Sequence, residues 1–132
     1  MELVIFSTPE KSSELHEKLT ADAEAILKKL NLVYRVQLLC SGDTSSASSK
    51  TYDLEVWFPG LKRWVEISSC SHFLDYQARR AKIRYKNEEG KNDYLHTLNG
   101  SGVAAGRLMA ALMEYHQKDG DIDFEKIETL LL

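Results

Sequence analysis

The stretch that decides the fold is TYDLEVWFPGLKRWVEISSC, residues 51–70. Two runs rich in β-branched and aromatic residues, 51–58 and 63–70, flank a Pro-Gly turn at residues 59–62, and this pattern predicts a β-hairpin. Side chains alternate between the two faces of a strand. In the second run we therefore expect two sets on opposite faces: Trp64, Glu66 and Ser68, and Val65, Ile67 and Ser69.

The chain before this hairpin alternates a strand, a helix and a second strand. A short strand is expected over residues 1–6, and an amphipathic helix begins at an N-cap on Ser12 or Ser13 and ends near Asn31. A second strand covers residues 34–40. The serine-rich segment 41–50 is interpreted either as a solvent-exposed connection or as a loop next to a substrate.

The chain after the hairpin predicts two further strands, over residues 79–85 and 94–98. The sequence Asn99-Gly100-Ser101-Gly102 opens a helix of about 14 residues that Asp119-Gly120 ends, and a weak final helix follows. Because most strands are too close in sequence for parallel crossovers, we predict an α+β domain with a mainly antiparallel β-sheet flanked by helices.

Composition limits the classes of protein that fit. The 132 residues suit one domain, and the chain shows neither a secretory signal nor an apolar run that approaches a membrane span. Cys40 and Cys70 lack CxxC spacing, which favours free, buried thiols in a reduced cytosolic setting over a disulfide or half of a metal site. The net charge of −3 argues against a dedicated nucleic-acid binder, and we interpret the basic segment 77–86 as a solvated strand edge.

The residues alone support only a possible anion site. The spacing of Gly100, Gly102 and Gly106 does not match the dinucleotide fingerprint GxGxxG, but the unpaired amides at a helix N-terminus can receive an anion, with Arg107 beside it. Glu66 near hydroxyls is suited to Mg²⁺, although a cross-strand pair with Lys or Arg is favoured without further information. The four histidines lie at no metal-binding spacing.

Four stretches, in order and covering nearly the whole chain, carry a family resemblance. Residues 34–43 resemble the YR…CTGD segment of the seryl-tRNA synthetases, and residues 50–57 read KTYDLEVW as that family does. Residues 66–80 are similar to its EISSCS…DFQARR segment. Residues 96–107 resemble HTLNGSG…GR, which includes motif 3 of the class II aminoacyl-tRNA synthetases. The resemblance implies the C-terminal part of a class II catalytic domain over residues 1–132, from the end of motif 2 through motif 3.

The resemblance also implies a chemistry and its residues. Serine and ATP give seryl-adenylate, from which serine passes to tRNA(Ser) by orientation and charge stabilisation. Arg107 and Glu66 are then the catalytic residues, with Arg107 clamping the triphosphate and Glu66 and Ser69 holding Mg²⁺. The implied ATP-binding set is Glu66, Ile67, Ser68, Ser69 and Arg107. The implied serine-binding set is Glu2, Asn99 and Ser101.

In the family, a tRNA-gripping arm, motif 1 at the homodimer interface and the motif 2 arginine precede the segment that this chain matches. We therefore expect an N-terminally truncated catalytic domain with weak or no activity alone, belonging to a cytoplasmic homodimer that binds no membrane. Two alternatives stay open: a non-catalytic paralogue that serves as a binding or assembly module, and a ligase relative that aminoacylates another acceptor, such as a carrier protein.

Overall fold

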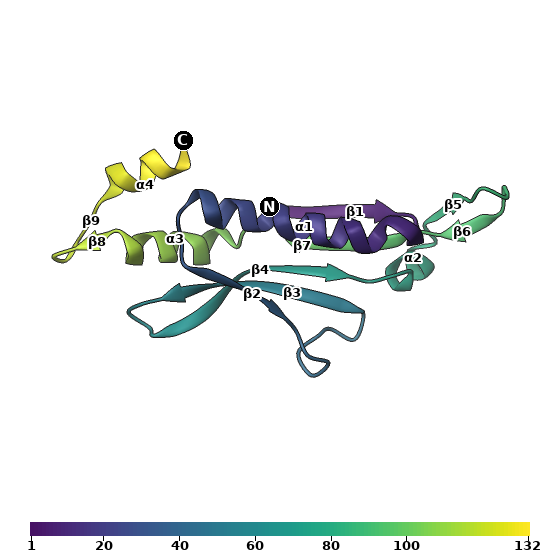
Figure 1. The fold of residues 1–132 in the computed structure, drawn as a ribbon, viewed down its shortest axis with the longest axis horizontal. Helices are drawn as coiled ribbons and strands as arrows, with labels where there is room; N and C mark the ends of the chain where they lie inside the picture. Colours follow the sequence, from purple (N-terminus) through teal and green to yellow (C-terminus); the bar gives the residue numbers. More distant parts are fainter.

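The computed structural model describes residues 1–132 and centres on a five-stranded sheet in the order β1-β7-β4-β3-β2, in which every neighbouring pair is antiparallel (Figure 1). This confirms the predicted α+β class. The strands of this sheet are β1 (Glu2–Ser7), β2 (Tyr34–Leu38), β3 (Lys50–Phe58), β4 (Arg63–His72) and β7 (His96–Ser101). The two short hairpins are β5 (Arg84–Lys86) with β6 (Asn92–Tyr94), and β8 (Gln117–Lys118) with β9 (Asp121–Ile122).

The helix α1 (Pro9–Lys29) packs across β1, β7 and β4 and covers one face of the sheet (Figure 1). Its buried stripe includes Leu19, Ala23 and Leu27, which join Leu54 and Leu98 of the sheet in one apolar core. The apolar face of the amphipathic helix thus supplies the burial that stabilises the sheet. The helix begins at Pro9 because proline suits the first helical position. Thr8 is therefore the N-cap residue, and the predicted cap on Ser12 or Ser13 is wrong.

The predicted hairpin is confirmed as β3 and β4, but it contains a β-bulge that the alternation did not predict. Leu54 lies opposite Ser68, whereas Glu55 lies opposite Glu66, so Ile67 is the extra residue on β4. Beyond the bulge the alternation of side chains is shifted by one. As a result, Ser69 lies on the face of Glu66 and Trp64, while Ser68 turns into the core, where it is 1% exposed.

The prediction that the segment 99–101 opens a helix is wrong. The segment forms the end of β7, between β1 and β4. The helix α3 (Ala105–Tyr115) begins later and is 11 residues long. Asp119 and Gly120 do not end α3; they have φ values of 55° and 86° and form the turn between β8 and β9. A turn with two left-handed residues matches the twist of a two-residue hairpin. The last helix, α4 (Phe124–Leu131), confirms the expected final helix.

The predicted strand 79–85 is wrong, because the basic segment folds as the helix α2 (Tyr76–Ala81) followed by β5. Two contacts favour the helix, and each joins residues that are one helical turn apart. Arg79 pairs with Asp75 at 3.4 Å, and the Arg80 guanidinium lies 3.4 Å from the centre of the Tyr76 ring. Lys82 ends the helix in the left-handed conformation with a φ of 58°.

Both cysteines are free, as predicted, but only Cys70 is buried, because Cys40 lies just beyond the end of β2 and is exposed. No helix combines the length and the apolar character that crossing a bilayer requires.

Three histidines that are distant in sequence form a cluster of tilted rings between α1 and the sheet. The ring of His72 lies 5.8 Å from that of His16 and 5.5 Å from that of His96. Burial lowers the pKa of His72 to about 4 and also lowers the pKa of His16. Both rings keep a buried nitrogen without a hydrogen-bond partner, so protonation inside the fold is unfavourable.

Gly100 allows β7 to approach β4 closely. A Cβ at this position would lie 2.7 Å from the Cys70 Sγ and 3.3 Å from the Cys70 Cα. We predict that Gly100→Ala lowers the free energy of unfolding by about 1–3 kcal/mol, measured by urea denaturation, because the added methyl group forces the strands apart. The matched control is Gly106→Ala in the helix α3, because an added Cβ at Gly106 has no neighbouring atom within 4 Å. That change should raise stability by about 0.5–1 kcal/mol. Equal effects of the two substitutions would contradict the packing role of Gly100.

The histidine cluster predicts a loss of stability in mild acid. The ordinary histidine pKa of 6.5 applies to the unfolded chain, whereas His72 in the fold has a pKa of about 4. Between these values the unfolded state binds the additional proton, so stability falls as the pH falls from 6.5 to 4, by about 2.5 kcal/mol. Urea denaturation of the wild type and of His72→Phe across this range tests the prediction. The pH dependence should be shallower in the variant, and identical slopes would show that His72 does not cause it.

Candidate functional site

The face of the sheet opposite α1, here called the open face, carries most of the polar side chains that the sequence singled out. Residues directly opposite in an antiparallel pair project to the same side of the sheet. The register pairs Glu2 with Ser101, Asn99 with Ser71, Asp53 with Ser69, and Glu55 with Glu66. The open face therefore presents, across β1, β7, β4 and β3, the side chains of Glu2, Asn99, Ser101, Glu66, Ser69, Ser71, Asp53 and Glu55.

Glu66 and Arg107 are brought together at one side of the open face. The Arg107 Nη1 donates a hydrogen bond of 2.6 Å to the Glu66 carbonyl and lies 3.5 Å from the Glu66 Oε2. Arg107 is in the first turn of α3, and that helix is held against β4 by the Ala104 amide, which donates to the Ile67 carbonyl at 2.7 Å. Both side chains are 40% or more exposed, so the guanidinium and the carboxylate remain accessible to a ligand.

The bulge decides which members of the segment 66–69 face this site. Ser69 joins Glu66 on the open face, and both offer the hard oxygen atoms that Mg²⁺ prefers. Ile67 is fully buried, and Ser68 donates a hydrogen bond to the Ser101 carbonyl from within the core. The side chains of Ile67 and Ser68 thus hold the strands together and do not reach the open face.

Glu2, Asn99 and Ser101 form a second polar group on β1 and β7. The Ser101 hydroxyl donates a hydrogen bond of 3.0 Å to the Glu2 Oε2. Asn99 lies two residues along β7 on the same side, opposite Val4 and Ser71. A carboxylate beside a hydroxyl and an amide can bind an ammonium and a hydroxyl group together.

Two carboxylates on β3 that the sequence analysis did not assign also face the open face. Glu55 pairs with Arg35, whose guanidinium lies 4.8 Å from the centre of the Trp64 ring. Burial raises the pKa of Asp53, the nearby Glu66 and Glu55 raise it further, and Ser69 and Arg107 act in the opposite direction. The alternation in Thr51–Phe58 contained the signal for both residues, since it sets Asp53 and Glu55 on the face opposite Leu54 and Val56.

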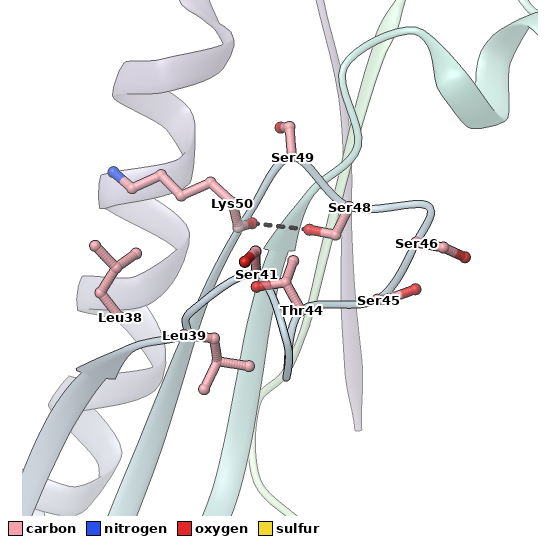
Figure 2. A pocket seen from close by; sticks show the side chains of 9 residues that line it. All are labelled: Leu38, Leu39, Ser41, Thr44, Ser45, Ser46, Ser48, Ser49 and Lys50. Atoms are coloured by element: carbon pink, nitrogen blue, oxygen red, sulfur yellow. Dashed lines mark hydrogen bonds between the residues drawn. The ribbon is translucent and has the colours of Figure 1, made fainter.

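The serine-rich loop between β2 and β3 lines a pocket of about 560 Å³ (Figure 2). Most of its lining is hydroxyl-bearing, and Figure 2 shows the hydrogen bond of 3.0 Å from the Ser48 Oγ to the Lys50 carbonyl. The Ser48 Oγ also lies 2.9 Å from the Thr51 Oγ1, which lies 2.8 Å from the Ser71 Oγ. Ser71 is opposite Asn99 in the sheet, so hydroxyl groups connect this loop to the open face.

The site is an open surface and not an enclosed cavity. None of the five principal pockets is lined by Glu2, Glu66, Ser69, Asn99 or Arg107. No three histidine, cysteine, aspartate or glutamate side chains are arranged as a metal site. Glu66 with the Ser69 hydroxyl nevertheless fits Mg²⁺, because this ion is commonly held by one or two carboxylates together with substrate phosphates and water.

Comparison with known protein sequences agrees with the motifs. Residues 1–116 match the family model "tRNA synthetase class II core domain (G, H, P, S and T)". The serine–tRNA ligase of Leptospira biflexa is 67% identical over 121 residues, which are 91% of this chain and 29% of that protein. The serine–tRNA ligase of Caldicellulosiruptor bescii is 61% identical over 123 residues, with the same 29% of its length covered.

Solved structures agree as well. The crystal structure of the seryl-tRNA synthetase from Pyrococcus horikoshii complexed with ATP superposes with a TM-score of 0.88 at 37% identity, over 99% of this chain and 30% of that one. The cytoplasmic serine–tRNA ligase from Naegleria fowleri in complex with AMP gives a TM-score of 0.83 at 30% identity, over 92% of this chain and 30% of that one. The chain thus spans about 30% of the length of these relatives. With its antiparallel sheet and its match to the family model over residues 1–116, the chain belongs to the class II tRNA synthetase core domain family and resembles its serine–tRNA ligases.

Proposed function

We propose that the open face is the substrate-binding floor of a seryl-tRNA synthetase, which activates serine with ATP and transfers it to tRNA(Ser). The observation that carries this proposal is the contact of Arg107 with Glu66 on the face that also presents Glu2, Asn99 and Ser101. Activation joins the serine carboxylate to the α-phosphorus of ATP and releases pyrophosphate. It needs the two substrates side by side, and neighbouring strands hold the two groups of residues side by side.

The phosphate-binding group is Glu66, Ser69 and Arg107. Arg107 carries a planar, permanently charged guanidinium that binds phosphate oxygens through paired hydrogen bonds, which makes it the candidate clamp for the triphosphate. Glu66 and Ser69 are the candidate ligands for Mg²⁺, which when bound neutralises phosphate charge. In this assignment Arg107 exchanges its contacts with Glu66 for contacts with ATP.

The serine-binding group is Glu2, Asn99 and Ser101. The Glu2 carboxylate accepts the substrate ammonium, and Asn99 and Ser101 supply the donors and acceptors for its remaining polar groups. A site built from such groups rejects an analogue without the hydroxyl, because its own polar atoms would then lose their partners.

Three further assignments in this proposal rest on the resemblance to the seryl-tRNA synthetases and belong to the whole enzyme. They are tRNA(Ser) as acceptor, a second subunit in a homodimer and a cytoplasmic location. The cytoplasmic serine–tRNA ligase of Naegleria fowleri, a structural neighbour, supports the last of these.

Serine-dependent exchange of pyrophosphate into ATP tests the activity. We expect little or no exchange by this chain alone. Exchange should appear when the chain is mixed with the remaining part of the Leptospira biflexa ligase, because the site of this chain is an open surface and the remaining part would enclose the substrates. Alanine in place of serine is the substrate control. If circular dichroism shows that both parts are folded and the mixture still gives no exchange, the result would favour the non-catalytic binding or assembly module.

Arg107→Ala tests the phosphate clamp directly. We expect the affinity for ATP with Mg²⁺, measured by calorimetry, to fall by about tenfold or more, since a charge-assisted hydrogen bond contributes roughly 1.5–3 kcal/mol. The free energy of unfolding should change by less than about 1 kcal/mol, because the pair with Glu66 is exposed. Arg84→Ala, an exposed arginine on β5, is the matched control and should leave ATP affinity unchanged. Equal affinities of the two variants would exclude Arg107 as the clamp.

A further inference from the structure

Asp53 is a carboxylate beside the phosphate-binding group to which neither the motifs nor the proposed function gives a role. It lies on β3 opposite Ser69, two residues from Glu55, which lies opposite Glu66. Its Oδ1 atom is buried and has no hydrogen-bond partner. A buried carboxylate oxygen without a hydrogen-bond partner lowers the stability of the fold. Its presence therefore suggests a functional role, such as an interaction with a ligand.

The charges around Asp53 are not balanced. Of the three carboxylates in this part of the open face, Glu66 has Arg107 and Glu55 has Arg35. Asp53 forms no ion pair. The cluster therefore keeps an excess of one negative charge directly beside the Ser69 hydroxyl, and a cation at Glu66 and Ser69 would neutralise it.

We propose that Asp53 is a positioning residue of the divalent-cation site at Glu66 and Ser69. Its carboxylate orients the Ser69 hydroxyl, so that a lone pair of that oxygen points toward the ion, and adds the charge that draws the ion to this strand. The inference rests on the proposed function, since it assumes that Glu66 and Ser69 hold the cation. Replacing a residue that orients a metal ligand typically lowers metal affinity or activity by about 10- to 100-fold.

Mn²⁺ is the probe, because electron paramagnetic resonance measures the concentration of the free ion directly. Asp53→Asn keeps the size of the side chain and removes the charge. We expect the Mn²⁺ affinity of the 132-residue chain to fall by about tenfold. Asp22→Asn is the matched control, since Asp22 lies on α1, pairs with Lys18 and should leave the affinity unchanged.

The melting temperature without metal separates a positioning role from a structural one. If Asp53 is held in place for a cation, Asp53→Asn should raise the melting temperature of the metal-free chain, since an uncompensated charge is lost. A lower melting temperature with unchanged Mn²⁺ affinity would show that Asp53 serves the fold alone and would overturn the inference.

Glu66→Gln separates the inference from the proposal on which it rests. Weaker Mn²⁺ binding in both Glu66→Gln and Asp53→Asn supports both. Weaker binding in Glu66→Gln alone overturns the role of Asp53 and leaves the cation site in place. If Glu66→Gln binds Mn²⁺ with the affinity of the wild type, or if the wild-type chain binds no Mn²⁺, the cation site and the role of Asp53 are both overturned.

Discussion

The arrangement of the candidate site depends on one extra residue in one strand. In a regular strand Glu66 and Ser69, three positions apart, would project to opposite faces. The bulge at Ile67 places both on the open face and sends Ser68 into the core, where its hydroxyl bonds to the Ser101 carbonyl. A single irregularity thus joins β4 to β7 on one side and completes the oxygen pair on the other. Bulges are frequent next to active sites because they redirect side chains in this way.

The second constraint is the close contact between β4 and β7. Gly100 faces Cys70 without space for a side chain, and this contact sets the strand that carries Ser101 and Asn99 against the strand that carries Glu66 and Ser69. The serine-binding and phosphate-binding groups are therefore neighbours for a steric reason. The α1 helix supplies the apolar support beneath both strands, so the polar residues above them do not also have to form the core.

Much of the fold could be predicted from local patterns. The β3–β4 hairpin, the amphipathic helix and the antiparallel class followed from alternation, helical spacing and a Pro-Gly turn. The wrong predictions have two causes. Tertiary pairing overrode local composition at residues 99–101, whereas local signals were missed at the start of α1 and in α2. Asn99-Gly100-Ser101 has the composition of a helix start, yet pairing with β1 and β4 makes it a strand. The basic segment at 77–86 lacks clear periodicity, and its ion pair and ring contact are visible only once α2 has formed. For the site, the motifs predicted the residues of the two polar groups and the alternation in β3 carried the signal for Asp53, whereas the bulge required coordinates.

The pairing of β1 with β7 has a consequence for the order of folding. Glu2 to Ser7 is synthesised well before its partner strand, His96 to Ser101. The backbone groups of β1 therefore stay without their β7 partners until almost a hundred further residues have been synthesised. Such non-local pairing gives a high contact order, which slows folding and leaves Val4 and Phe6 available for aberrant association during synthesis. The strand that carries Glu2, the proposed ammonium-binding residue, is thus among the last parts of the sheet to pair.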